Sequence, residues 1–265
     1  MVHCHRQVKK AIALGRRLQK CANVMTLGVC PSFSDYSPEE ADLIRKAEKI
    51  YYPTIFYADI FDALGKRIFP GYHNYKCAQD KIKQTAMIQL AGLPHPRTKT
   101  YYKKQSIEAI LADFTFPFIA KIPRGSAQGK GVFLISNIEA LVRYTESVSP
   151  AYIQEYLETD RDIRVVIIGD TIALAYWRIA AAGEFRNNVA AGGAVSLDPI
   201  PQEAADLALK TARTCGWNDV GLDIIRADNR FYVIEANMKY GREGFARAGI
   251  DYHEMMSKKI DNNEI

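Results

Sequence analysis

Two apolar runs near the C-terminal end, residues 220–225 and 231–237, constrain the fold of this chain most. Both are rich in β-branched and aromatic residues, and only a short polar segment separates them, so they are expected to pair as an antiparallel hairpin. If the hairpin turns about Asn229, Asp223 lies opposite Glu235, and Gly221 lies opposite Asn237. Glu235 and Asn237 are two residues apart on one strand and therefore point to the same face.

This pairing places two carboxylates at cross-strand distance, where they repel each other. A divalent cation between them would remove that repulsion, and carboxylate and amide oxygens are ligands that suit Mg²⁺ also held by nucleotide phosphates. The sequence therefore predicts a metal site formed by Asp223, Glu235 and Asn237. An exposed hairpin with polar side chains facing water is the alternative.

A glycine-rich segment, residues 120–132, lies between two further β-rich runs at 116–122 and 132–136. Backbone N–H groups of such a loop can approach phosphate oxygens, and Lys121 on the entering strand would direct a cation at the same phosphates. No Lys-Ser/Thr pair opens a helix here, so the pattern is not a Walker A loop.

Two polar clusters accompany strand-like runs in the second half of the chain. Residues 152–157 are followed by Asp162 and Arg164, where a strand that ends irregularly offers backbone groups to a purine edge. Arg178 is followed by a polar loop over residues 184–188 and a Gly192-Gly193 turn. Taken alone, an ordinary strand end explains the first cluster better, and a solvated loop is the alternative for the second.

The remaining pattern separates a first part, to about residue 74, from a strand-rich remainder. In the first part we expect an amphipathic helix with a basic face over residues 8–22, a helix over 38–50 and connecting structure over 50–60. Residues 80–90, 138–144 and 202–215 show helical spacing, and residues 151–156, 163–168 and 171–178 read as strands. The polar tail from Lys258 is expected to fray. The sum is an α+β chain with a mostly antiparallel second half.

Composition limits the function classes. The chain of 265 residues has no apolar run of the roughly 20 residues that a membrane span needs and no secretion signal, so we expect a cytoplasmic protein without membrane contact. The five cysteines form no CxxC pair, which argues against a zinc ribbon or a disulfide framework. A net charge of +5 suits an anionic nucleotide or acidic substrate, and no recognition motif accompanies it, so nucleic acid is not the partner we expect.

The polar motifs occur in an order and spacing that resemble the ATP-grasp superfamily, and within it the RimK-type glutamate ligases. The resemblance covers about residues 75–240 and rests on these motifs: Asp80-Lys81, Lys121 with its glycine-rich loop, Gln154-Glu155-Tyr156, Asp162-Ile163-Arg164, Phe185-Arg186-Asn187-Asn188, Asp223 and Glu235-Ala236-Asn237. It implies a short N-terminal α/β lobe (residues 1–78), a small ATP-grasp subdomain (79–156) and a C-terminal subdomain with the metal site (157–265), with antiparallel sheets around an ATP cleft.

The resemblance also implies roles for individual residues. The ATP-binding residues would be Lys81, Lys121, Gly125, Ser126, Gly129, Gly131, Gln154, Glu155, Tyr156, Asp162, Arg186 and Asn188. Within this set, Glu155 and Tyr156 would grip adenine, and Arg186 and Asn188 would contact the γ-phosphate side. Asp223, Glu235 and Asn237 would hold one or two Mg²⁺, with Mn²⁺ as a substitute ion. Arg164, Arg178 and Arg186 are the candidate catalytic residues.

The implied activity is ADP-forming ligation of a carboxylate to an amine through an acyl phosphate. The acceptor would be a small-molecule, peptide or protein carboxylate, and the donor an amino-acid amine. Residues 238–244 depart from the small residues and Pro-Gly usual in the family, so whether glutamate is the added amino acid stays open. An ATP-binding regulatory module and a carboxylate kinase without ligation are the alternatives, and a homo-oligomer also stays open.

Overall fold

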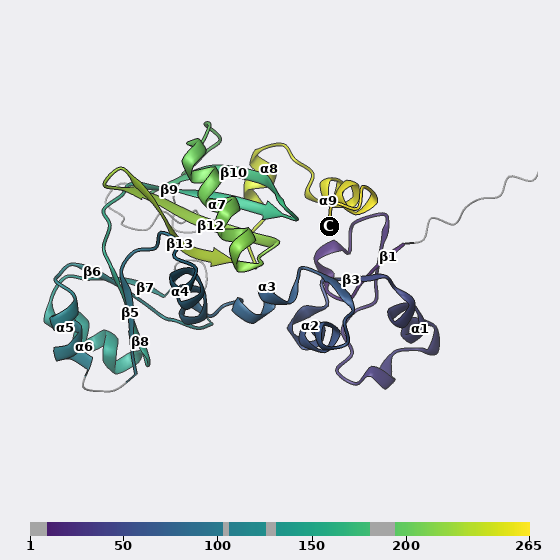
Figure 1. Ribbon diagram of the computed structural model, residues 1–265, viewed down its shortest axis with the longest axis horizontal. Coiled ribbons are helices and arrows are strands. Elements are labelled where there is room, and N and C mark those ends of the chain that lie inside the picture. The colour runs from purple at the N-terminus through teal and green to yellow at the C-terminus, as the bar shows by residue number, and fades with distance from the viewer. Residues whose placement is uncertain (1–9, 103–105, 126–130, 181–193) are drawn as a thin grey trace, which may run out of the picture.

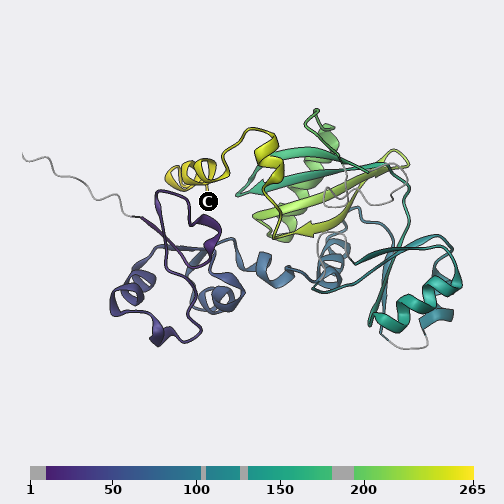
Figure 2. The same cartoon turned by 180° about the vertical axis from the view of Figure 1, so that it is seen from behind.

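The computed structural model describes residues 10–102, 106–125, 131–180 and 194–265. Three sheets follow one another along the chain, and the sheet nearest the N-terminus lies at the opposite end of the elongated molecule from the second (Figure 1). The third sheet lies between these two, and the reverse view shows the same order (Figure 2).

The N-terminal lobe is a parallel sheet of strand order β2-β1-β3-β4. Its elements are β1 (Ala11–Ala13), η1 (Arg16–Leu18), β2 (Val24–Thr26), η2 (Phe33–Asp35), α1 (Pro38–Lys46), β3 (Lys49–Tyr51), α2 (Thr54–Ala63) and β4 (Arg67–Phe69). Ser37 opens α1 with a reciprocal capping box to Glu40. The α/β character of this lobe agrees with the sequence prediction.

The basic helix predicted over residues 8–22 is wrong for the described part of that range. Residues 11–13 form the central strand β1, and a single 3-10 turn, η1, follows it. Ile12, Ala13 and Leu14 are all buried because a central parallel strand is covered on both faces. Such a strand lacks two-residue alternation, so its apolar residues were mistaken for a helical stripe.

Two further predictions for this lobe need correction. The helix predicted over 38–50 ends at Lys46, because residues 49–51 form strand β3 beside β1. Residues 50–60, predicted as connecting structure, contain the end of β3 and most of α2. The apolar character of α2 on all sides hid the helical period.

The second sheet is antiparallel, with strand order β5-β8-β6-β7. Its strands are β5 (Thr98–Tyr101), β6 (Phe118–Lys121), β7 (Val132–Ile135) and β8 (Ala151–Glu155), and its helices are α5 (Ser106–Asp113) and α6 (Ile138–Ser147). The helices cover one face, where Phe118, Ala120 and Ile153 join Ile110 and Leu141 in one core. Lys121, Tyr152 and Gln154 therefore point to the other face.

The third sheet is also antiparallel, with strand order β11-β10-β9-β12-β13. Its strands are β9 (Arg161–Ile168), β10 (Thr171–Ile179), β11 (Ala194–Ser196), β12 (Asp219–Ala227) and β13 (Arg230–Asn237). Helix α7 (Gln202–Cys215) covers one face, where Ala204, Ala208 and Ala212 pack on the strands, and it ends at Gly216 in the left-handed conformation. No helix in the described ranges combines the length and apolar character needed to cross a bilayer.

The two cross-strand pairs predicted for the last hairpin are confirmed, but the predicted turn about Asn229 is not, because a β-bulge at Ile234 shifts the register by one residue between these pairs and the turn. Asp223 pairs with Glu235, and Gly221 pairs with Asn237. Asp228 and Asn229 form the turn with φ of 48° and 59°, values that Asp and Asn tolerate better than most residues and that suit a tight hairpin.

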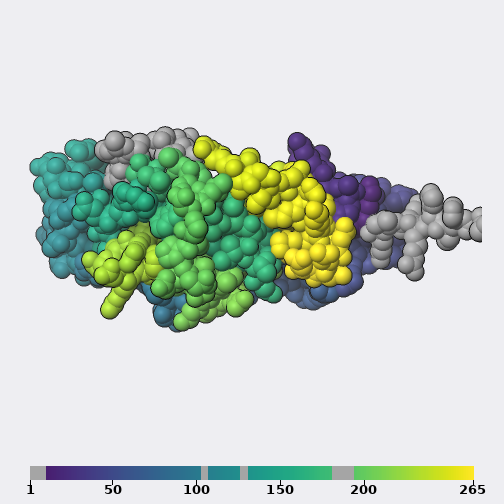
Figure 3. Space-filling view, turned by 90° about the horizontal axis from the view of Figure 1, so that it is seen from above, coloured from purple at the N-terminus to yellow at the C-terminus, as the bar shows by residue number. Residues whose placement is uncertain are grey.

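The frayed tail predicted from Lys258 is wrong. Helices α8 (Glu243–Arg247) and α9 (Tyr252–Asp261) follow β13, and α9 includes Lys258. The Ile265 side chain is buried, and its backbone carbonyl accepts a hydrogen bond from Tyr51 Oη at 3.0 Å. The C-terminus therefore joins the third sheet to the N-terminal lobe, and α9 lies against that lobe in the space-filling view (Figure 3).

Candidate active site

The candidate residues lie on strands β9, β10, β12 and β13, on strand β6 and on helix α4 (Lys81–Leu90), elements that meet between the second and third sheets (Figure 1). Ile163 and Val165 on β9 pack beneath α7, so Asp162 and Arg164 point to the opposite face. Asp223 on β12 and Arg178 on β10 share that face, because Asp223 pairs with Arg164 and Arg178 pairs with Asp162.

Four buried charges form a continuous cluster on this face. Arg178 donates through Nε and Nη2 to both Asp162 oxygens, at 2.6 and 2.8 Å, and its Nη2 lies 3.0 Å from Asp223 Oδ2. Arg164 binds Asp223 through Nε and, at 3.1 Å, through Nη2. Within the described part of the chain, Nη1 of both arginines has no hydrogen-bond partner, which leaves one donor edge of each guanidinium for a substrate.

Asp223 is ionised at neutral pH although it is only 5% exposed. Burial alone would raise the pKa of Asp223, but the guanidiniums of Arg164 and Arg178 more than offset burial and lower that pKa below its usual value. Asn237 Nδ2 donates to Asp223 Oδ2 at 3.1 Å, so the amide oxygen of Asn237 faces away from Asp223.

Two lysines approach the same hairpin. Lys81, the first residue of α4, is 6% exposed, and its Nζ lies 3.2 Å from Glu235 Oε1. Lys121, at the end of β6, is 5% exposed, and burial lowers its pKa to about 8. The charge of Lys81 acts in the same direction on that pKa, while Glu235 and Asp223 oppose it. The structure thus brings Lys81, Lys121, Asp223, Glu235 and Asn237 together, as the sequence predicted.

The hairpin carries the kinds of oxygen donor that a magnesium ion shared with phosphates takes, while in this structure Arg164, Arg178 and Asn237 donate to the Asp223 carboxylate. Asp223, Glu235 and the Asn237 amide present hard oxygen atoms on one face, and Asp223 carries its charge at neutral pH. Across the described ranges, no group of three or more His, Cys, Asp or Glu residues is arranged to hold a metal by itself. A site with two carboxylates and one amide therefore requires further oxygens, which Mg²⁺ ordinarily takes from water and phosphate.

Helix α4 also positions the hairpin through a residue that the sequence analysis missed. The buried Gln84 amide donates to Ala236 O at 2.8 Å and accepts from Ala236 N at 3.2 Å. Ala236 lies between Glu235 and Asn237, so Gln84 fixes the backbone that carries both. Gln84 follows Lys81 by three residues on the same helical face, which is the sequence signal that could have revealed it.

The N-cap of α4 tethers the start of the glycine-rich loop. Asp80 accepts from Lys83 N at 3.1 Å and forms an ion pair with Arg124 at 3.0 Å. Gly125 has φ of +69°, a conformation that favours glycine, and Gly131 O accepts from Ile122 N at 2.8 Å. Ser126 and Gly129, also predicted to bind ATP, lie outside the described residues.

The predicted adenine-binding residues lie where β8 ends and the chain passes to the third sheet. Gln154 is buried and donates to Thr98 Oγ1 at 3.0 Å, and the Glu155 carboxylate accepts from Arg97 N. Tyr156 is half-buried immediately after the strand. Arg186 and Asn188, predicted on the γ-phosphate side, fall outside the described residues. The predicted adenine-binding segment thus lies at the junction of the second and third sheets.

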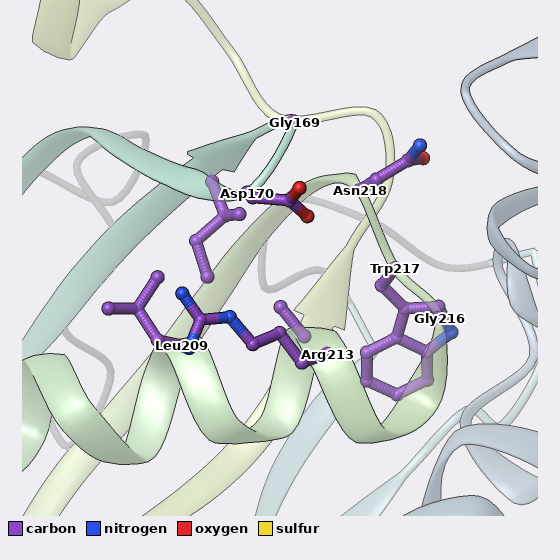
Figure 4. A pocket seen from close by; sticks show the side chains of 9 residues that line it. Gly169, Asp170, Leu209, Arg213, Gly216, Trp217 and Asn218 are labelled. Carbon is purple, nitrogen blue, oxygen red and sulfur yellow. The ribbon is translucent and has the colours of Figure 1, made fainter. Parts of the chain in front are cut away.

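A separate cavity of about 270 Å³ lies at the far end of the third sheet (Figure 4). Arg213 and Leu209 of α7 and Asp170 of the β9–β10 turn line it, together with Trp217 and Asn218. None of the predicted site residues lines this cavity.

Comparison with known proteins shows which family this chain resembles. Residues 78–260 match the family model of the RimK-like ATP-grasp domain. The ribosomal protein bS6–L-glutamate ligase of Escherichia fergusonii is 31% identical over 199 residues, which cover 70% of this chain and 64% of that protein. A probable α-L-glutamate ligase of Legionella pneumophila is 32% identical over 202 residues, covering 70% of this chain and 66% of that protein. The chain thus spans slightly less than two thirds of either relative.

Among solved structures, the ATP-grasp ligase PsnB complexed with a minimal precursor superposes with a TM-score of 0.69. The match covers 96% of this chain and 98% of the other at 16% identity. At that identity the likeness establishes the ATP-grasp fold, with its mixed helices and antiparallel sheets.

Proposed function

The chain belongs to the RimK-like ATP-grasp family, and we propose that it is an ATP- and Mg²⁺-dependent carboxylate–amine ligase. The observation that carries this proposal is the convergence of Lys81 and Lys121 on the hairpin that presents Asp223, Glu235 and Asn237. The two carboxylates and the amide oxygen would bind the magnesium ion, and the two lysines would bind the phosphates of the same magnesium–triphosphate complex.

The Lys81–Glu235 ion pair suggests how the site accepts its nucleotide. Glu235 would hold the magnesium ion in place of Lys81, and Lys81 would then bind a phosphate oxygen in place of the carboxylate. Each buried charge then keeps an opposite charge beside it, which limits the desolvation penalty of binding. Magnesium would supply positive charge to the phosphate oxygens and to the transferred phosphoryl group.

Ligation then proceeds without a side-chain nucleophile. The substrate carboxylate attacks the γ-phosphorus, ADP leaves, and the acyl phosphate so formed is attacked by the amine with release of phosphate. Lys121 would stabilise charge on the phosphates, and the Nη1 groups of Arg164 and Arg178 would donate to the oxygens that gain charge. We place Gln154, Glu155 and Tyr156 at the adenine, and Arg186 and Asn188 toward the γ-phosphate. The resemblance implied a place near the ribose for Asp162, but its carboxylate accepts two hydrogen bonds from Arg178, so we assign it to holding that arginine instead.

The relatives suggest the class of substrate. One is a ligase of glutamate to a ribosomal protein, and PsnB has been crystallised with a minimal precursor, Mg and ADP. We therefore propose that the carboxylate acceptor is a peptide or protein and that the amine donor is an amino acid. Glutamate is the first donor to test.

A screen for ADP release over amino acids and peptide carboxylates, with mass spectrometry of the products, tests this function. We expect ADP and a product whose mass has increased by one amino-acid residue. ADP with an acyl phosphate and no new amide would indicate a carboxylate kinase. ATP binding without ADP release under any condition would indicate a regulatory module and contradict ligation.

The low pKa of Lys121 predicts how nucleotide affinity depends on pH. Lys121 loses its proton as the pH rises through about 8, so its attraction for phosphate declines above that pH. We expect the Kd of a non-hydrolysable ATP analogue to increase roughly tenfold between about pH 7 and about pH 9. Lys121→Arg should flatten this dependence because arginine stays charged, whereas Lys99→Arg on β5, an edge strand of the same sheet, should retain it. An equally flat profile in the unmodified protein would contradict the placement of Lys121 at the phosphates.

A further inference from the structure

The segment that follows β13 contains a buried tyrosine beside the reacting face. Residues 238–244 depart from the small residues and Pro-Gly usual in the family, and Tyr240 lies within this stretch. Tyr240 follows the end of β13 by only three residues, yet it is just 3% exposed. It belongs to the core that joins the third sheet to the N-terminal lobe. No step of the proposed ligation uses Tyr240.

Tyr240 and Arg164 lie against the same bare position of β12. Because successive side chains of a strand alternate, Asp219, Gly221 and Asp223 share the face opposite α7. A Cβ added to Gly221 would lie 3.0 Å from Tyr240 Cβ, 3.1 Å from Arg164 Cδ and 3.2 Å from Arg164 Nη1. The space above Gly221 is therefore filled by these two side chains and has no room for a third.

Three contacts hold Tyr240 in place. Its hydroxyl donates to Asp219 Oδ1, and its carbonyl oxygen accepts from Arg17 Nη1 at 3.4 Å. The Arg17 guanidinium also lies over its ring, 4.4 Å from the centroid. Asp219 is a β12 residue, whereas Arg17 belongs to η1 of the N-terminal lobe. Tyr240 is therefore fixed both to the third sheet and to the other lobe.

The hydroxyl contact resists displacement because it is buried. Asp219 is 0% exposed, and burial raises the pKa of its carboxyl group, while the Arg17 charge and the hydrogen bonds from Tyr240 and Tyr52 oppose that rise. A hydrogen bond between two groups that water does not reach is costly to break, since both polar atoms then lack a partner. The Tyr240 ring is thus a firm wall rather than an adaptable one.

We propose that Tyr240 is a positioning residue, which closes the space above Gly221 and so holds the Arg164 guanidinium with Nη1 toward the reacting carboxylate. This inference rests on the proposed ligase function and gives the N-terminal lobe a part in the active site through Arg17. Asp223 fixes one edge of the guanidinium by accepting from Nε and Nη2. Tyr240 and Gly221 fix its position over the strand.

Gly221→Ala tests this contact with a single added methyl group. We expect Arg164 to move, because the anchors of Tyr240 prevent that ring from yielding. A displacement well below 1 Å should lower kcat for ADP release by about tenfold, since about 1 Å can lower a rate by about 10²-fold. The Kd of a non-hydrolysable ATP analogue should change by less than about twofold, because the lysines and the hairpin carboxylates are untouched.

The matched control is Gly241→Ala. Gly241 directly follows Tyr240, and a Cβ added to it would meet no atom within 4 Å. This variant makes the same chemical change one residue from Tyr240 without touching Arg164, so kcat should stay at the value of the unmodified protein.

A double-mutant cycle distinguishes the Tyr240 anchor from a general loss of packing. Tyr240→Phe removes the hydroxyl that binds Asp219 but keeps the ring, so the ring can yield to an added methyl group. In this background Gly221→Ala should lower kcat by less than about threefold. Tyr52→Phe removes the hydrogen bond to the other Asp219 oxygen and leaves the Tyr240 hydroxyl unchanged. In that background the full effect of about tenfold should persist.

Two kinetic results would overturn this role of Tyr240. They are a kcat of Gly221→Ala within about twofold of the unmodified protein, and an equal effect of Gly221→Ala with and without the Tyr240 hydroxyl. A crystal structure of Gly221→Ala adds a test that needs no turnover. Displacement of Arg164 with Tyr240 in place would support the proposal, and Arg164 in its original position would overturn it. Absence of ADP release from the unmodified protein would contradict ligation, and the crystal structure would still decide whether Tyr240 holds Arg164.

Discussion

Replacing Glu235 with Gln is expected to lower the rate of ADP formation by about 10²–10³-fold, the scale seen when one charge-stabilising group is removed from an active site. Glu235 supplies one of the two carboxylates proposed to hold magnesium, and glutamine has nearly the same shape without the charge. The fold should persist, because Glu235 is only partly buried and the Gln84 contacts to the Ala236 backbone do not involve its side chain.

The matched control for this change is Glu48→Gln. Glu48 is an exposed glutamate that also forms an ion pair, with Arg67, but it lies in the N-terminal lobe away from the hairpin. ADP release and urea unfolding should be measured for both variants. A turnover within threefold of the unmodified protein in Glu235→Gln would remove Glu235 from the metal site.

Replacing Asp223 with Ala is expected to lower the free energy of unfolding by about 3–5 kcal/mol, the cost of removing one partner from a buried ion pair. Asp223 binds Arg164 and Arg178, both of which are buried, and its loss leaves Arg164 without its carboxylate partner. Arg178 retains Asp162, so the loss at Arg164 dominates. Activity should also disappear, because we propose the same carboxylate as the second magnesium ligand.

The two carboxylates of the hairpin therefore have different expected signatures. Glu235→Gln should impair turnover with little change in the urea midpoint, whereas Asp223→Ala should impair both. Combining Asp223→Ala with Arg164→Met removes the unpaired buried cation and should restore part of the stability without restoring activity. A loss below 1 kcal/mol in Asp223→Ala would mean that solvent reaches the arginines and that the buried cluster is described wrongly.

The sequence predicted the last hairpin well because its information is local. Asp228 and Asn229 tolerate positive φ and form the turn, and the apolar runs on each side indicate the two strands. The bulge at Ile234 that brings Asp223 opposite Glu235 was not predicted, because bulges depend on the packing of the whole sheet. Helix α7 was predicted with its observed bounds for a similar reason, since its apolar spacing runs from Gln202 to Cys215 and Gly216 ends it. Turn chemistry and periodicity act within a few residues, so one sequence reveals them.

The charge cluster could not be predicted in the same way. Arg164 lies on β9 and Asp223 on β12, and β10, β11 and helix α7 separate these two strands along the chain. The two residues become neighbours only because β9 pairs directly with β12 in the sheet. The sequence singled out these residues individually but not their contacts with one another. The N-terminal lobe was misread for a different reason, because buried parallel strands of three residues carry neither alternation nor a helical period.

The central claim is that the Asp223–Glu235–Asn237 face holds a magnesium ion that also binds the nucleotide triphosphate. A crystal structure with magnesium and a non-hydrolysable ATP analogue tests it most directly. The account predicts oxygen atoms of all three side chains directed at the metal, Lys81 moved from Glu235 to a phosphate, and Lys121 beside the phosphates. A bound nucleotide with Glu235 still paired to Lys81, and with no metal at the three side chains, would contradict it.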